Sequence, residues 1–193
     1  LARIPLGVVP VEKDGSVYFK APVGKSIYFQ LLNENGMAVQ SMRSATYVHS
    51  GEQMSCLGCH ESKRQISRLK SAPLAVGRAP SELKPEVEKY VMFNFHQNVK
   101  PIFANKCIGC HKAKDKAGPK DMSYKALDSY IFYLGHGCNV PLHGGSRVEP
   151  GKFGALFSRM GKALLNEDHQ KFMKECKFTQ QDMRTISVWL DLN

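Results

Sequence analysis

The chain has 193 residues, with 27 Lys and Arg against 17 Asp and Glu, and 42% of its residues are hydrophobic. This composition is that of a globular protein with one large or two small domains, so it excludes disordered and fibrous proteins. The sequence contains no run of about 18 apolar residues, and we therefore expect no membrane span. A net charge of +10 is typical of many nucleic-acid-binding proteins. The basic residues are scattered and there is one Trp, however, so we predict no nucleic acid partner.

Residues 1–75 are predicted to form a β-rich segment. Two runs of β-branched and aromatic residues, Val17–Lys20 and Ser26–Leu32, predict strands. Asp14-Gly15 before the first run and Asn35-Gly36 after the second are turn signals. The segment is too small to close a sandwich or barrel alone, which suggests the end of a larger β domain.

A Pro-containing linker is predicted over residues 76–90, followed by a mainly helical, cytochrome c-like domain over 91–193. Residues 91–103 are rich in apolar side chains and predict a helix, with Pro101 near its start.

The last helix is predicted from a capping pair, Thr179 and Asp182. One face of this helix is apolar and consists of Met183, Ile186, Trp189 and Leu190. The predicted fold class is therefore α+β, with a β-rich segment in front of a helical domain.

Four of the six cysteines occur in two copies of one motif, C-x-x-C-H, the attachment signature of c-type haem. Two thiols at this spacing can bond to the two vinyl groups of one porphyrin, and the following His can bind the iron as proximal ligand. A C-x-x-C pair alone would also suit zinc or a redox disulfide, but the His that follows in both copies favours haem. We predict two covalently bound haem c groups. The attachment residues are Cys56, Cys59, Cys107 and Cys110, and the proximal ligands are His60 and His111.

The distal ligands decide whether each iron transfers electrons or binds a substrate. For the second haem we favour His169, in the expected loop before the last helix, with His143 as second choice. Met173 and Met160 are thioether alternatives that would raise the reduction potential.

For the first haem, His49 and His96 are the candidate distal ligands, and neither position is compelling. This favours an open or weakly ligated iron. The candidates for binding propionates or an anion nearby are Arg43, Arg64 and Arg68, with ordinary surface charges as the alternative.

The two remaining cysteines are Cys138 and Cys176. Because haem attachment of this kind takes place in an oxidising compartment, a disulfide between them is one interpretation, and two separate thiols are the other.

Several segments of the chain resemble the haem region of hydrazine synthase alpha subunits and their homologues. The segments that carry the resemblance are residues 38–49, 51–61, 143–146, 150–154 and 189–191. The resemblance implies a preceding β-propeller, and a multi-subunit complex that joins nitric oxide-derived hydroxylamine and ammonia into hydrazine. It also implies one haem at the condensation site and a second, bis-histidine haem that passes electrons.

The chain departs from the synthases at the first haem, where they have a tyrosine ligand a few residues after the motif His. Here the first tyrosine after His60 is Tyr90.

We therefore expect electron transfer within a hydrazine synthase alpha-like protein. The alternative is a catalytic subunit that acts on small nitrogen compounds at an open first haem. Expected partners are other redox proteins or haem subunits, in a larger chain or hetero-oligomer. The expected location is the periplasm or an equivalent oxidising compartment, which is the anammoxosome lumen for a true synthase.

Overall fold

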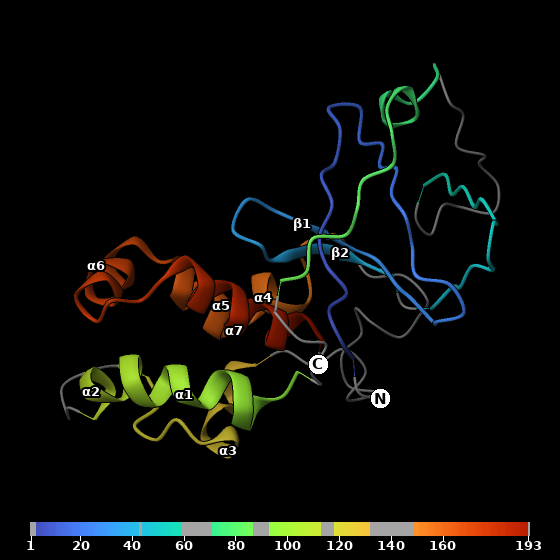
Figure 1. The fold of residues 1–193 in the computed structure, drawn as a ribbon. Helices are drawn as coiled ribbons and strands as arrows, with labels where there is room; N and C mark the ends of the chain where they lie inside the picture. Colours follow the sequence, from blue (N-terminus) through green and yellow to red (C-terminus); the bar gives the residue numbers. More distant parts are fainter. Residues whose placement is uncertain are drawn as a thin grey trace. The chain divides into compact units, whose positions relative to one another are not determined.

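The computed structural model describes residues 3–42, 44–58, 71–86, 93–112, 118–131 and 149–192. The chain forms two compact units (Figure 1). The first comprises Leu1–Tyr28 and Met42–Met92, and the second comprises Phe29–Ser41 and Phe93–Asn193. The second unit therefore combines a short N-terminal hairpin with the helical half of the chain.

The first unit consists mostly of extended chain joined by isolated bridges. These bridges pair Val8 with Lys84, Phe19 with Ser81, and Ile27 with Thr46. The strand predicted over Val17–Lys20 is wrong, because this run meets a partner only at the single Phe19 bridge and has no continuous ladder.

A short 3₁₀ turn, η1 (Leu74–Gly77), also belongs to the first unit. Its first two backbone N–H groups donate to the side chains of the predicted Asp14-Gly15 turn region. Leu74 donates to Asp14 at 2.8 Å and Ala75 donates to the Ser16 hydroxyl at 3.0 Å. Leu74 and Ala75 directly precede the predicted linker, and two linker residues, Ser81 and Lys84, are bridged into the same unit.

The only named strands in the described ranges, β1 (Gln30–Leu32) and β2 (Ala38–Ser41), form an antiparallel hairpin in the second unit. The turn between them contains Asn35-Gly36, as predicted, and Gly36 has a left-handed φ of 72°. The strand predicted over Ser26–Leu32 is therefore confirmed at its end, Gln30–Leu32, together with the turn that follows it. The structure is nevertheless mixed α+β.

A continuous helical segment runs from Phe95 to His111 and confirms the helix predicted before the second motif. It alternates between π-helical and α-helical turns: η2 (Phe95–Val99), α1 (Lys100–Ile102), η3 (Phe103–Cys107) and α2 (Ile108–His111). Asn94, not a residue next to Pro101, caps its start by accepting from the Gln97 N–H at 2.9 Å. Pro101 lies inside the segment, directly after a π-helical turn. Such a turn is one way for a helix to accommodate a residue without an N–H.

The described part of the second unit contains further helical elements (Figure 1). They are α3 (Tyr124–Leu127), η4 (Asp128–Tyr130), α4 (Gly154–Phe157), α5 (Arg159–Leu165), α6 (Glu167–Glu175) and α7 (Gln180–Leu192). Their shared core is built around Trp189, whose ring lies 5.2 Å from that of Phe95 and 6.5 Å from that of Phe103. This core therefore packs the motif-bearing helical segment against α7.

The predicted capping pair of α7 is confirmed. The Thr179 hydroxyl accepts from the Asp182 N–H at 3.1 Å, and the Asp182 carboxylate accepts from the Thr179 N–H at 2.7 Å. The predicted apolar face is also correct, because Ile186, Trp189 and Leu190 are buried and Met183 packs against them.

Within the described ranges, no helix combines the length and the apolar content that crossing a bilayer requires.

Candidate functional site

The second C-x-x-C-H motif lies at the end of the helical segment that begins at Phe95. Cys107 is the last residue of η3, and Cys110 and His111 are on α2, so the motif has the short helical turn that its spacing predicts. Cys110 is exposed, whereas Cys107 is half-buried against the core. Burial, followed by the nearby Cys176, raises the pKa of the Cys107 thiol to about 11.

His169 lies in the first turn of α6 and not in a loop, which corrects the prediction. Asn166 caps this helix, because its side chain accepts from the His169 N–H at 2.9 Å. The cap fixes where α6 begins, and therefore where the His169 side chain leaves the helix.

The structure brings the His169 ring next to that of His111, the predicted proximal ligand. Their ring centroids are 6.1 Å apart and the two planes are inclined by 80°. The His111 Nδ1 atom is buried and has no hydrogen-bond partner among the described residues. Burial, then the His169 and Lys120 charges, lower the pKa of His111 and so favour the neutral imidazole that can bind a metal.

The second imidazole is also oriented by its surroundings. The Nδ1 atom of His169 lies 2.9 Å from the Ala163 carbonyl oxygen, to which it can donate a proton. Such a bond leaves Nε2 unprotonated, and a backbone carbonyl is a common partner of the outer nitrogen of a metal-binding His. The geometry of His169 thus suits a ligand of the Nε2 type.

The distance between the imidazoles can be compared with what one metal ion requires. Imidazole nitrogens bind metals at about 2.0–2.1 Å, so two rings on opposite sides of one ion have centroids roughly 6 Å apart. The 6.1 Å centroid separation equals this length, and the two rings form an edge-on, T-shaped contact. Among the described residues, no group of three or more His, Cys, Asp or Glu is arranged to hold a metal alone. A haem held by this motif would be attached through Cys107 and Cys110, which precede His111 on the same helical segment.

Met160 and Met173, the thioether alternatives to His169 as distal ligand, both contact the hydrophobic core of the second unit. Met160 is buried in the core of the second unit, and Met173 packs against that core. Of the candidate distal ligands that the structure describes, His169 is the one found in ring contact with His111.

The first motif is described only in part. Cys56 is exposed in the first unit. His49 is exposed, with its ring 5.0 Å from that of Tyr47, and His96 is exposed on η2 in the second unit, with its ring 5.4 Å from that of Phe95. The other predicted residues lie outside the described ranges: Cys59, His60, Arg43, Arg64, Arg68, Cys138 and His143.

Cys176 is placed beside the second motif. Its Sγ lies 3.9 Å from the Sγ of Cys110. The sequence interpretation considered only Cys138 as a partner for this thiol.

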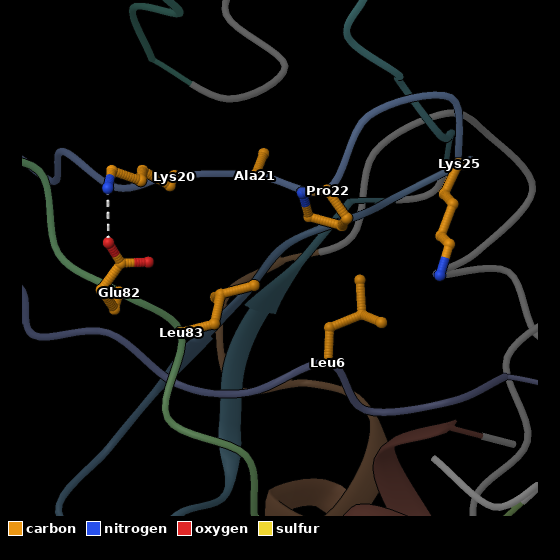
Figure 2. A pocket seen from close by; sticks show the side chains of 7 residues that line it. All are labelled: Leu6, Lys20, Ala21, Pro22, Lys25, Glu82 and Leu83. Carbon is orange, nitrogen blue, oxygen red and sulfur yellow. Dashed lines mark hydrogen bonds and ion pairs between the residues drawn. The ribbon is translucent and has the colours of Figure 1, made fainter. Parts of the chain in front are cut away.

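The first unit also contains a hollow of about 360 Å³ (Figure 2). It is lined by Leu6, Lys20, Ala21, Pro22, Lys25, Glu82 and Leu83. The Lys20 ammonium and the Glu82 carboxylate form an exposed ion pair at 2.6 Å on one side of it. None of the candidate haem residues within the described ranges is among these lining residues.

One family model matches part of the chain. Residues 2–61 match the hydrazine synthase alpha subunit middle domain. The match supports a relation to hydrazine synthase alpha subunits, and it ends just after His60, so it includes the first motif. Residues 62–193, with the second motif, lie outside it. No curated protein and no solved structure matches the chain.

Two residues around the imidazole pair were missed in the sequence. The Asn-Glu-Asp-His run from Asn166 is an N-cap followed by acidic residues, a signal that could have placed His169 in a first helical turn. Gly118 has no such signal. A Cβ added to it would lie 2.9 Å from the His111 Cε1 atom, so its backbone packs directly on the ring.

Proposed function

We propose that this chain is a c-type cytochrome region with two covalently bound haem groups, related to hydrazine synthase alpha subunits. In the second unit, Cys107 and Cys110 would attach one haem, and His111 and His169 would bind its iron. The observation that carries this proposal is the pair of imidazoles with centroids 6.1 Å apart beside two motif cysteines.

A haem with two strong side-chain ligands supplies one-electron transfer, because neither axial position is open to a substrate. The residues of the chain support this role by holding both rings in place. Asn166 sets the start of α6 and Ala163 accepts from the His169 ring. Gly118 packs against the His111 ring. Fixed ligands keep the geometry unchanged between the two oxidation states, which favours electron transfer.

A second candidate function is catalysis on small nitrogen compounds at the first motif. The observation that favours it is the family match, which covers the first motif and bears the name of a synthase subunit. In that case the second haem would deliver electrons to the first, and partner subunits would be required. Attachment of haem through thioethers fits the periplasm or an equivalent oxidising compartment.

The test of the axial pair compares His169→Ala with two matched controls in the haem-loaded full chain. His169→Ala is expected to convert one low-spin ferric haem to high spin in the optical spectrum. His96→Ala removes an exposed His of the same unit, and Met173→Leu removes the thioether alternative; both should leave the spectrum unchanged. A spin change in Met173→Leu, with none in His169→Ala, would contradict the proposed ligand pair.

A further inference from the structure

The second motif has a third thiol within reach, which its spacing does not require. Cys176 follows α6 directly, and its Sγ is 3.9 Å from that of Cys110, although the two residues are 66 positions apart. A disulfide bond is about 2.05 Å long, so a further approach of about 2 Å would join them.

A separate contact holds these two parts of the chain together. The Lys106 ammonium, directly before the motif, donates to the Lys177 carbonyl at 2.9 Å and to the Asp182 carboxylate at 2.6 Å. Lys177 directly follows Cys176. The two segments that carry the thiols are therefore also joined by a contact in which neither thiol takes part.

The two motif thiols differ in their access to an external reagent. Cys110 is exposed, whereas Cys107 is half-buried against the helical core. Cys176 is also partly exposed. A disulfide-containing oxidant can therefore reach Cys110 and Cys176 more readily than Cys107.

We propose that Cys110 and Cys176 form a disulfide before haem attachment, and that reduction of this bond is required before the second motif can take its haem. This inference rests on the proposed function. In an oxidising compartment, a protein or small-molecule disulfide accepts two electrons from the two thiols. The Cys110–Cys176 bond forms, the oxidant's S–S bond breaks, and the two protons leave with its two thiols. A dithiol reductant reverses the exchange and frees the Cys110 thiol to add across a vinyl group, a step with no net oxidation.

The linkage is tested on the full chain produced without haem attachment. Free thiols are blocked by alkylation at acid pH, and the peptides are mapped by mass spectrometry without reduction. The expected product is a peptide joining Cys110 to Cys176, absent from the Cys176→Ser variant. Finding Cys107–Cys110 or Cys138–Cys176 as the main linkage, or only alkylated thiols, would overturn the inference.

The consequence is tested by haem loading with and without a dithiol reductant. In the wild type, the reductant should raise covalent haem at the second motif several-fold. In Cys176→Ser, and in Cys176→Ala as a second variant, loading should no longer depend on it. Equal dependence in wild type and variants would refute the role of Cys176. Normal loading without any Cys110–Cys176 linkage would refute this inference and leave the proposed function intact. A confirmed linkage with no haem at this motif under either condition would refute the proposed function.

Discussion

Asp191, on α7, joins this helix to two other elements of the unit through one buried carboxylate. Its two oxygens accept from the backbone N–H of Ala38 on β2, at 2.8 Å, and of Ala155 on α4, at 2.7 Å. Burial raises the pKa of Asp191 to about 6, although the two backbone donors and Arg184 act in the opposite direction. The side chain is therefore part of the framework that supports α7, and has no place among the candidate ligands.

Asp191→Asn is expected to destabilise the protein by about 1–3 kcal/mol, because the amide cannot accept from both backbone donors. The measurement is urea unfolding at neutral pH. Asp168→Asn, on the exposed side of α6, is the matched control and should change stability by less than about 0.5 kcal/mol.

The effect of Asp191→Asn on stability is expected to decrease as pH rises. Because the folded state holds the Asp191 proton more tightly than the unfolded chain, the carboxyl's contribution to stability is largest below the unfolded pKa and falls as pH rises towards about 6. The stability difference between wild type and Asp191→Asn should therefore shrink over this range. A difference that grows with pH would contradict the account.

Gly118 is a positioning residue for the His111 ring. It has a φ of +98°, and a Cβ there would lie 2.9 Å from Cε1 and 3.1 Å from Nδ1 of that ring. Gly118→Ala is expected to displace the imidazole and lower the fraction of low-spin haem in the loaded protein. Gly151→Ala is the matched control, since Gly151 also has a positive φ, +73°, but no neighbour within 4 Å of an added Cβ. It should cost stability and leave the spectrum as in wild type; equal spectral effects would exclude a specific role for Gly118.

The start of α7 connects the last helix to the motif-bearing one. Thr179 and Asp182 cap the helix, and Asp182 also accepts from Lys106, the residue before the first cysteine of the motif. Burial alone would raise the pKa of Asp182, but the bonds from Lys106 and Thr179 outweigh it and lower this pKa. The cap therefore stabilises both the helix and its contact with the second motif.

Thr179→Ala is expected to lower the free energy of unfolding by about 1 kcal/mol, because the hydroxyl no longer accepts from the Asp182 N–H or donates to the Asp182 carboxylate. Thr185→Ala, in the middle of the same helix, is the matched control. Its hydroxyl bonds only to the Gln181 carbonyl, and Ala is the better helix former, so stability should change little. Chemical denaturation of the two variants distinguishes capping from a general effect of Thr→Ala.

Asp182→Asn tests the charge at this position. Because its folded pKa is lowered, the carboxylate stabilises the protein above its unfolded pKa, and this stabilisation is lost as pH falls through the folded value. Wild type should therefore exceed Asp182→Asn in stability at neutral pH and approach it in acid. A constant difference across the range would show that the charge is not involved.

Local sequence patterns predicted the elements whose partners are close in the chain. The α7 cap and apolar face, the Asn35-Gly36 turn and the helical second motif each depend on residues within one or two turns of one another. The strand predicted at Val17–Lys20 failed because a strand needs a continuous partner, and the pattern of one run does not show whether a partner exists. For the same reason the sequence did not reveal that Cys176 approaches Cys110, or that Asp191 bonds to Ala38.

The family match and the observations that support electron transfer come from different parts of the chain. The family match covers residues 2–61, which include the hairpin of the second unit and the first motif. The observations that support electron transfer come instead from helices outside the match. If the proposal is correct, denatured and purified chain should have the mass of the polypeptide plus two haem groups. A mass equal to that of the bare polypeptide, from a host competent in cytochrome c maturation, would rule out every version of the haem account.

The most direct test is an electron paramagnetic resonance spectrum of the oxidised, haem-loaded protein, recorded before and after addition of nitric oxide. The haem bound by His111 and His169 is expected to give a low-spin ferric signal, and this signal should persist when nitric oxide is added. It should be missing from the His169→Ala spectrum. If nitric oxide converts every haem signal, or if only high-spin signals are present at the start, the second iron has an open position and the assignment of this haem to electron transfer is wrong.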